Sequence, residues 1–397
     1  MALASAYFHG FEVLSAAGRG LDALESAWHR GDSPGMVAAP GWGMEGGALP
    51  VGRVLEPLLQ PKDCPPELDS RNNRLAWTAL QGLLEPVAAA VERFGAGRVG
   101  VVIGTSTSGV SEAEAAFQAR QDSGSKGLPA AFRYETQEIG SPARFAAWAL
   151  GLQGPAMVVS TACSSSGKAL ATARRLLRLG VCDAVLCGGV DSLCRFTVRG
   201  FGALGAVSDE RCRPFSRARK GINIGEAAAF TLLSREPSEV RLAGCGESSD
   251  GYNVSAPLPQ GEGAEAAMRA ALRDAGCGPT DIGYLNLHGT ATAQNDAMEA
   301  AAALRVFPGG VPCSSTKPLT GHTLGAAGAL EAALCWHLLR GAARRGLPPN
   351  WNGGDDDPAT AGLGLLGQRG PDGPLKRALS NSFGFGGSNV SLLLEGA

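Results

Sequence analysis

The sequence lacks the features that mark several classes of protein. Its 397 residues carry 35 basic and 37 acidic side chains, so no general basic excess is available for nucleic acid and no polybasic block for a membrane surface. No run of about 18 apolar residues occurs, so we expect no membrane span. The N-terminus does not show a basic segment followed by an apolar stretch, as a secretory signal would. We therefore expect a cytoplasmic protein.

Paired cysteines are absent and histidine is scarce. The ten cysteines stand singly, without a Cys-x-x-Cys pair, so the sequence predicts no zinc ribbon, no redox dithiol and no metal site. Several cysteines lie in apolar runs, where a cysteine is usually a small core residue. Of the five histidines, only His288 and His322 stand in glycine-bracketed turns. These two are the candidates for chemistry.

Glycine, in contrast, is abundant. There are 57 glycines, about twice the average usage of roughly 7%. Many lie at the ends of apolar runs, in GTSTSG, CGGVDS, TGHTLGAAG and FGFGG. Sharp turns and close approaches to a ligand need residues without Cβ, so these glycines mark candidate sites. With 44% hydrophobic residues the chain should form a packed globule, either as two fused cores or as one large layered domain.

Short apolar runs alternate with longer amphipathic stretches. RVGVVIGTS and AMVVSTAC are typical of buried strands, and DAVLCGGV of a third. SEAEAAFQARQ and SSSGKALATARRLLRLG are typical of helices. This alternation predicts an α/β fold with a mostly parallel sheet.

Two parts of the sequence share one outline of elements. VVSTACSSSGKALATARRLLRLG and PCSSTKPLTGHTLGAAGALEAALCWHLLRG each give a strand, a sharp turn and then a helix that ends before a glycine. GVVIGTSTS and GYLNLHGTAT both place Gly-Thr after an apolar strand. We therefore predict two duplicated α/β halves, residues 1–240 and 241–397, with the boundary between residues 235 and 255.

Cys163 is the candidate nucleophile. It lies in STACSSSG, between a strand pattern and a helix pattern, where backbone N–H groups and the positive end of a helix dipole would face the sulfur. A position at a helix start lowers the pKa of a thiol and favours the nucleophilic thiolate. Alone, Cys163 could equally be a buried structural residue, so the interpretation depends on its partners.

Three further motifs supply those partners. NLHGTAT places His288 at the end of an apolar strand, and STKPLTGHTLGAAG places Lys317 and His322 in one glycine-rich segment. The order of residues does not match a phosphate-binding P-loop. NSFGFGGSN surrounds Phe385 with small turn residues and could offer backbone N–H groups to a site. Alone, His288 could also be a core histidine that is satisfied by hydrogen bonds.

Together these motifs resemble the elongating β-ketoacyl-[acyl-carrier-protein] synthases. TACSSSG, HGTAT, STKPLTGH with GAAG, and NSFGFGGSN occur in that family's order, and the resemblance extends over nearly the whole chain. It implies a thiolase-like fold with five layers, α-β-α-β-α, built from two duplicated halves. It also implies an acyltransferase that forms a carbon–carbon bond between an acyl group and malonyl-carrier.

The resemblance implies a role for each site residue. Cys163 would hold the acyl group, and His288 and His322 would stabilise the enolate formed as malonyl-carrier loses CO₂. The backbone N–H groups of Cys163 and Phe385 would form the oxyanion hole, and the Phe385 ring would act as a gate. By the same matching, Lys317 would support His322, Asp296 and Glu299 would hold the polar network, and Thr290 and Thr292 would bind the pantetheine arm.

The partner is implied in the same way. It is an acyl carrier protein that brings its own phosphopantetheine, so the enzyme would need no cofactor of its own. The segment LDSRNNRLAW matches the start of the family's carrier-docking helix, which makes Arg71 and Arg74 candidate contacts. A solvated helix face is the alternative for these arginines. The family usually forms a homodimer, and a heterodimer with a second ketosynthase-like subunit is the alternative.

Some residues depart from the pattern of primary fatty-acid synthases. GTSTSG is more polar than the usual loop, and RNNRL and GINIGEAA are closer to ketosynthases of specialised clusters, particularly those that make aryl polyenes. Three other assignments compete. A thiolase would need a second catalytic cysteine, an initiating ketosynthase would carry Asn in place of His322, and a non-catalytic chain-length subunit would lack Cys163.

Overall fold

The computed structural model describes residues 5–43, 46–341, 346–367 and 374–396. The strands are β1 (Tyr7–Ser15), β2 (Gly18–Arg19), β3 (Met36–Ala39), β4 (Leu49–Gly52), β5 (Val99–Gly104), β6 (Ala156–Val159), β7 (Ala184–Asp191), β8 (Ala227–Ser234), β9 (Val240–Ser249), β10 (Tyr284–Asn286), β11 (Cys313–Ser314), β12 (Arg377–Gly384) and β13 (Ser388–Gly396). The helices are α1 (Leu21–Arg30), α2 (Arg71–Leu80), α3 (Leu84–Phe94), α4 (Val110–Ser123), α5 (Ser141–Leu150), α6 (Ser165–Arg178), α7 (Arg195–Ala203), α8 (Glu262–Ala275), α9 (Ala293–Val306), α10 (Lys317–Thr320) and α11 (Ala327–Leu339).

The strands repeat one topology twice. In the first half the order across the sheet is β6-β5-β7-β8-β1, and in the second it is β11-β10-β12-β13-β9. In both halves the first three strands of that order are parallel to one another. The fourth strand is antiparallel to the third, and the fifth is antiparallel to the fourth. A single residue pair, Tyr7 with Arg241, joins β1 to β9 and makes one continuous sheet. The predicted duplication therefore extends to strands that showed no sequence similarity.

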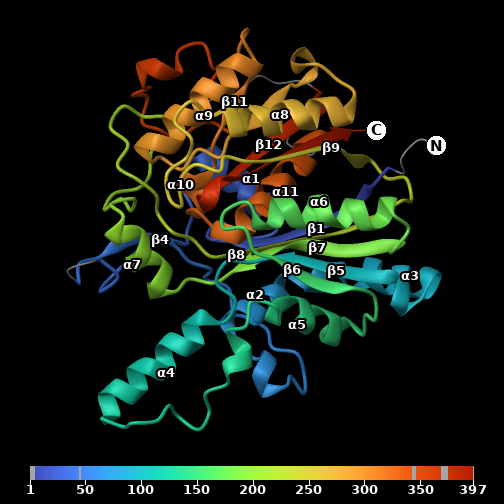
Figure 1. The fold of residues 1–397 in the computed structure, drawn as a ribbon, viewed down its shortest axis with the longest axis vertical. Coiled ribbons are helices and arrows are strands. Elements are labelled where there is room, and N and C mark those ends of the chain that lie inside the picture. Colours follow the sequence, from blue (N-terminus) through green and yellow to red (C-terminus); the bar gives the residue numbers. More distant parts are fainter. Residues whose placement is uncertain (1–4, 44–45, 342–345, 368–373, 397) are drawn as a thin grey trace.

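The elements form five layers. Figure 1 shows α8 and α9 on one outer face, α2 and α5 on the other, and α6 between the two halves of the sheet. Helices α6 and α11 pack against each other and against strands of both halves. All thirteen residues of α11 are buried, as expected of a helix that is surrounded by protein on every side. The predicted thiolase-like α-β-α-β-α fold is confirmed.

One strand differs from its prediction. AMVVSTAC was expected to be a buried strand, but β6 covers only Ala156–Val159, and the Met157 side chain is 36% exposed. The reason is its place in the sheet, because β6 pairs only with β5 and lies at the edge. Strands β5 and β7 are interior and buried at every position, as predicted. Among the described residues, none of the helices combines the length and apolarity that crossing a bilayer requires.

Candidate active site

Cys163 lies in a sharp turn between β6 and α6. The preceding residue, Ala162, has a φ of 51°, a left-handed backbone conformation that residues other than glycine seldom adopt. The Ser165 hydroxyl holds the turn closed by donating to the Ala162 carbonyl at 2.5 Å. Gly167 follows in α6, where a Cβ would lie 2.7 Å from Val390. The turn therefore places Cys163 between the two halves, with its side chain 4% exposed.

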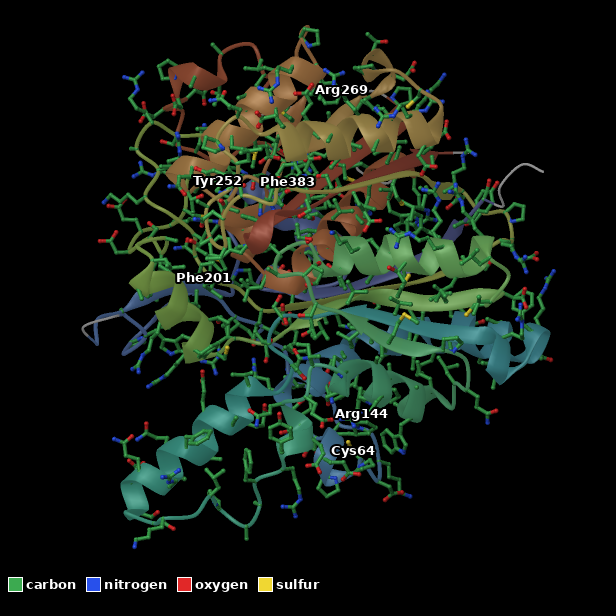
Figure 2. The ribbon with its side chains drawn as sticks, in the orientation of Figure 1. Cys64, Arg144, Phe201, Tyr252, Arg269 and Phe383 are labelled. Atoms are coloured by element: carbon green, nitrogen blue, oxygen red, sulfur yellow. The ribbon has the colours of Figure 1, made fainter. Side chains whose placement is uncertain are left out.

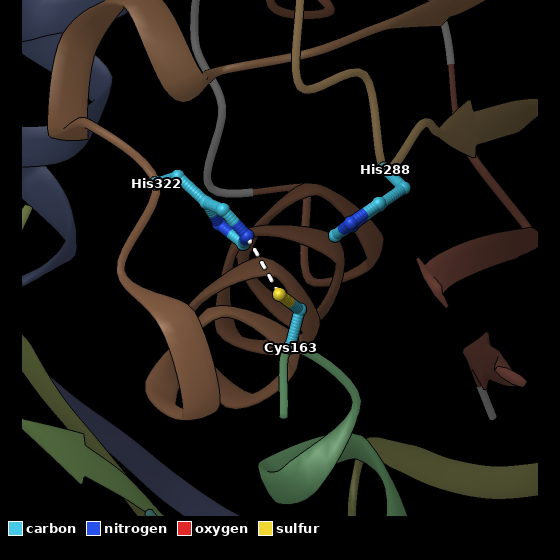
Figure 3. Close-up of side chains that lie close together, drawn as sticks. All are labelled: Cys163, His288 and His322. Carbon is cyan, nitrogen blue, oxygen red and sulfur yellow. Dashed lines mark hydrogen bonds between the residues drawn. The ribbon is translucent and has the colours of Figure 1, made fainter. Parts of the chain in front are cut away.

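Both candidate histidines reach this thiol from the second half of the chain. The Nε2 atom of His322 lies 2.9 Å from the Sγ atom of Cys163. The imidazole of His288 meets that of His322 edge to face, with ring centroids 5.3 Å apart (Figure 3). Gly321 allows this arrangement because its φ is 69° and a Cβ there would lie 2.9 Å from the backbone of Gly225. The three residues selected from the sequence thus form one cluster.

Burial controls the ionisation of this cluster. It raises the pKa of the Cys163 thiol to about 12, although the positive charge of Lys317 and a hydrogen bond from the Phe385 N–H lower it. The expectation of a thiol with a lowered pKa was therefore wrong for the resting protein, since loss of solvation outweighs the helix start. Burial and the charge of Lys317 hold the pKa values of His288 and His322 well below 6.5. The resting cluster is a thiol beside two neutral imidazoles.

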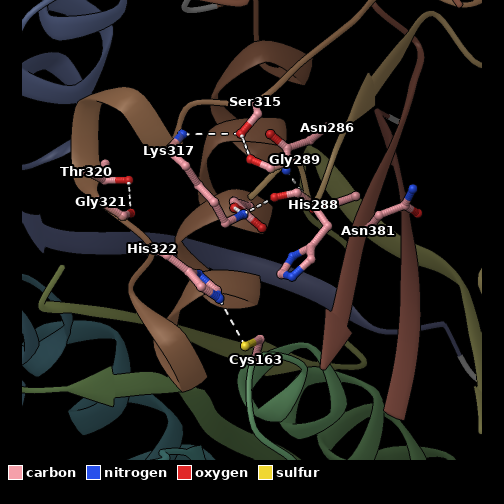
Figure 4. A network of polar contacts seen from close by, with 12 residues as sticks. Cys163, Asn286, His288, Gly289, Ser315, Lys317, Thr320, Gly321, His322 and Asn381 are labelled. Atoms are coloured by element: carbon pink, nitrogen blue, oxygen red, sulfur yellow. Dashed lines mark hydrogen bonds and ion pairs between the residues drawn. The ribbon is translucent and has the colours of Figure 1, made fainter. Parts of the chain in front are cut away.

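Lys317 lies behind the two imidazoles. Its ammonium group donates to the carbonyl oxygen of His288 and to the Oε1 atom of Glu331, the latter at 2.5 Å (Figure 4). It acts on His322 through its charge, which lowers the pKa of that imidazole. Glu331 was missed by the sequence analysis, although a lone glutamate in the apolar helix AGALEAALCWHLL is an available signal.

Glu299 and Asp296 on α9 hold the loop that carries His288. The Glu299 carboxylate accepts from the backbone N–H groups of His288 and Gly289, both at 2.8 Å. Asp296 accepts from the Ala291 N–H at 3.1 Å and from the Phe215 N–H at 2.7 Å. Both carboxylates are buried, and burial raises the pKa of Glu299 to about 7. Their contacts are with the backbone of the loop, so they fix its shape.

A cavity of about 390 Å³ leads to Cys163. Thr290, Thr292 and Phe385 line it together with both histidines. The Phe385 ring lies against Phe201 of α7, with centroids 5.1 Å apart. Phe201, Phe383 and Tyr252 lie on one side of the molecule in Figure 2. Phe201 was not selected from the sequence, because a phenylalanine in a short helix usually belongs to the core.

The loop that follows Phe385 is fastened to residues 250–254. The Gly386 N–H donates to the Val254 carbonyl at 2.8 Å, and the Asp250 N–H donates to the Gly387 carbonyl at 2.9 Å. Asp250 also lines the cavity. If the backbone at Phe385 moved and carried the ring with it, residues 250–254 would therefore have to move as well. The sequence analysis did not identify this second loop.

The two arginines selected for carrier docking lie at the start of α2, away from this cavity. The Nε atom of Arg71 donates to Glu226 at 2.9 Å, and that carboxylate is fully buried. Arg74 forms two bonds of 2.7 Å to Asp69, and its side chain is 41% exposed. Arg71 is therefore part of the fold, whereas Arg74 retains an exposed charge.

The cluster could also ligate a metal, since the donor atoms of Cys163, His288 and His322 lie within 4.8 Å of one another. Cys163 is the one cysteine that lines the cavity within the described parts of the chain. That arrangement gives no support to a thiolase, which would need a second one.

Comparison with known proteins decides the family. Residues 68–238 match the model of the β-ketoacyl synthase N-terminal domain, and residues 240–353 match that of the C-terminal domain. The chain belongs to the β-ketoacyl synthase family. The predicted enzyme class, an acyltransferase that forms carbon–carbon bonds, is thereby confirmed.

Individual relatives of this β-ketoacyl synthase agree with that result. Nodulation protein E of Rhizobium sp. (strain N33) is 34% identical, with 81% of each chain covered. 3-Oxoacyl-[acyl-carrier-protein] synthase 2 of Staphylococcus aureus is 32% identical, over 76% of this chain and 77% of that one. Among solved structures, the ketosynthase ApeO of Xenorhabdus doucetiae, in complex with its chain length factor ApeC, is 43% identical. Its TM-score is 0.94, over 99% of this chain and 98% of the other.

Proposed function

We propose that the protein catalyses the decarboxylative condensation of malonyl-carrier with an acyl group held on Cys163, in chain elongation of an aryl polyene or a related product. The observation that carries this proposal is the contact of 2.9 Å between Cys163 and His322, with His288 beside them in one cavity. An acyl carrier protein would deliver both substrates on its phosphopantetheine arm. The enzyme itself would then need neither a metal nor a cofactor.

The first half-reaction is transfer of the acyl group. The thiol proton passes to Nε2 of His322, and the thiolate attacks the carbonyl carbon of the acyl thioester. The N–H groups of Cys163 and Phe385 would donate to the oxyanion. Collapse of the adduct releases the pantetheine thiolate, which takes the proton back from His322. Cys163 is left as a thioester.

The second half-reaction forms the carbon–carbon bond. Malonyl-carrier loses CO₂, and the electron pair of the broken bond becomes an enolate on the thioester. The neutral imidazoles of His288 and His322, the latter now in its Nε2–H tautomer, would donate hydrogen bonds to the enolate oxygen and so stabilise it without transfer of a full proton. The enolate carbon then attacks the acyl thioester on Cys163. The Cys163 sulfur leaves as a thiolate, which takes up one proton from solvent to restore the thiol. Thr290 and Thr292 line the cavity where the pantetheine arm would lie.

We propose a second ketosynthase-like subunit as the stable partner. The exposed strand β6 leaves one edge of the sheet unpaired, which favours pairing with another chain. Phe117 on α4, a helix that projects from the body of the protein in Figure 1, is 51% exposed. The solved relative ApeO is in complex with a chain length factor, which supports a heterodimer, with a homodimer as the alternative. Light scattering of the protein, alone and with a co-expressed chain length factor, would distinguish the two from the measured masses.

Three smaller assignments belong to the same proposal. We propose that the two halves divide at residues 240 and 241, where β9 begins. We propose that the enzyme works in the cytoplasm, where carrier-bound intermediates are made. We also propose that Arg74 contributes to docking of the carrier, as argued in the Discussion.

Mass spectrometry of the intact protein tests the central proposal. The enzyme is incubated with a panel of acyl-carriers, and the added mass identifies the acyl group that is loaded. We expect loading on Cys163, its loss in Cys163→Ala, and formation of β-ketoacyl-carrier when malonyl-carrier is added. Full condensation by Cys163→Ala would refute the assignment of the nucleophile.

A further inference from the structure

Asp191 is a buried carboxylate that the proposed mechanism does not use. It is the last residue of β7 and has no exposed surface. Within the described parts of the chain, no lysine or arginine forms an ion pair with it. Burial raises the pKa of Asp191, and hydrogen bonds from Thr105, Ser106 and Thr107 act against that rise. Burying a carboxylate without a cation is costly, so its retention beside an active site points to a purpose.

The Asp191 carboxylate collects donors from the GTSTSG loop after β5. It accepts from the hydroxyls of Thr105 at 2.6 Å and Thr107 at 2.8 Å. It also accepts from the backbone N–H groups of Ser106 at 2.7 Å and Thr107 at 2.8 Å. This loop leads on to the nucleophile, because the Ser106 hydroxyl donates to the carbonyl of Ala162 at 3.2 Å. Asp191 thus supports the strained residue that precedes Cys163.

The same carboxylate also holds the segment that carries His322. The backbone N–H of Gly325, three residues after His322, donates to Asp191 at 2.6 Å. The approach is close, since a Cβ on Gly325 would lie 2.8 Å from the carboxylate and 2.8 Å from the Ser106 hydroxyl. Asp191 comes from the first half of the chain, and Gly325 comes from the second. One side chain therefore connects the turn of the nucleophile to the segment of its histidine.

We infer that Asp191 is a positioning residue, which sets the contact between Cys163 and His322 across the two halves. It does so through its hydrogen bonds to Thr105 and Thr107 on one side and to Gly325 on the other. The importance of this contact for acyl transfer rests on the proposed function.

Asp191→Asn tests the inference, because it nearly preserves the shape but removes the charge and one acceptor oxygen. Two rates at Cys163 are compared. Alkylation by iodoacetamide needs only the thiolate, and its rate is followed by peptide mass spectrometry between about pH 7 and 10, below the raised pKa of Cys163, where the rate rises with the thiolate fraction. Loading from an acyl-carrier also needs the correct placement of Cys163, His322 and the oxyanion donors.

We expect the two rates to respond differently. Alkylation of Asp191→Asn should be no slower than in the wild type, because it needs only the thiolate. Acyl loading should fall ~10- to 100-fold, since small misplacements of reacting groups are this costly. Ser192→Ala is the matched control, because the neighbouring hydroxyl makes one long bond of 3.4 Å to the Ser108 carbonyl and, among the described residues, none to Ala162 or to the segment that carries His322. It should leave both rates unchanged.

Ser106→Ala gives a second test if Asp191→Asn does not fold. It keeps the carboxylate and the backbone but removes the bond to the Ala162 carbonyl, so loading should fall severalfold with an unchanged alkylation profile. Unchanged acyl loading in either folded variant would overturn the inference. Alkylation needs no carrier, so a wild type that alkylates normally but loads no acyl group would instead refute the proposed function.

Discussion

Lys317 and Glu331 form a buried ion pair, with 2.5 Å between Nζ and Oε1 and side chains that are 2% and 4% exposed. The two residues lie on different helices, α10 and α11. The ammonium group also donates to the backbone of His288, so this pair connects the central helix to the active-site loop. The positive charge of Lys317 adds to the effect of burial in lowering the pKa values of the His288 and His322 imidazoles.

Removing only the acidic partner should be strongly destabilising. Glu331→Gln leaves the Lys317 charge buried without its counter-ion, and the loss of one partner of a buried pair costs about 3–5 kcal/mol. Chemical denaturation would measure this loss of unfolding free energy. The double variant Lys317→Met with Glu331→Gln should recover much of the stability but not the decarboxylation of malonyl-carrier. Recovery of activity in the double variant would show that the charge of Lys317 is not needed for chemistry.

The two histidines should differ in acyl loading. Both His288→Ala and His322→Ala should lose decarboxylation, because each imidazole would donate to the enolate. His322 is the one in contact with the Cys163 sulfur, so His322→Ala should also slow acyl loading, whereas His288→Ala should load at close to the normal rate. A burst assay with radiolabelled acyl-carrier separates the two steps. Normal decarboxylation in both variants would contradict the assigned roles.

The sequence predicted the reactive residues because each lies in a turn with a local signature. Cys163 and His288 follow apolar runs, His322 lies in a glycine-rich turn, and all three are close to small residues. Such turns can be identified without knowledge of the tertiary fold. The same holds for the interior strands β5 and β7, whose apolar runs reflect burial on both faces.

Residues whose role comes from a distant partner could not be predicted in this way. Asp191 and Gly325 are 134 positions apart, and Arg71 and Glu226 are 155 positions apart. A single acidic residue at the end of an apolar run gives no sign of what its carboxylate accepts. The prediction of a lowered pKa for the Cys163 thiol was wrong for a related reason, because the depth of burial of Cys163 depends on how the two halves pack together.

Stability should depend on pH through two opposing contributions. The folded-state pKa values of His288 and His322 are depressed, so the unfolded chain binds protons first and stability falls as pH drops below about 6.5. The folded-state pKa of Glu299 is raised to about 7, so its contribution is complete below about pH 4.3 and is lost as pH rises through 7. Each group contributes a slope of at most about 1.4 kcal/mol per pH unit.

Variants should separate these two contributions. Urea unfolding of His322→Gln between about pH 5 and 7 should show a smaller loss of stability toward acid than the wild type. Glu299→Gln should show the opposite change, with a steeper loss toward acid, because the compensating carboxyl has been removed. If the plots of unfolding free energy against pH were parallel for both variants and the wild type, these buried groups would have the same pKa values in the folded and unfolded states.

Arg74 is the sharper test of carrier docking. Arg71→Glu would bring a like charge against the buried carboxylate of Glu226, so we expect that variant to lose stability. Among the residues that the structure describes, Arg74 pairs only with Asp69, at the surface, where an ion pair contributes little to stability. Arg74→Glu should therefore fold normally and can report on binding alone. Arg74→Gln is its matched control, because it removes the charge without reversing it.

We expect the carrier to be acidic. Since the net charge of this chain is -2, attraction to such a carrier must come from a local basic group. We expect Arg74→Glu to raise the apparent KM for carrier-bound substrates severalfold, and Arg74→Gln to raise it less. Small acyl-pantetheine mimics carry no protein surface, so their kinetics should not change. Added salt should raise the apparent KM of the wild type toward that of the variants, since exposed charges are screened over about 10 Å at 0.1 M salt. Equal losses with carrier and mimic would show that Arg74 serves the fold, and no loss with either would place the docking surface elsewhere.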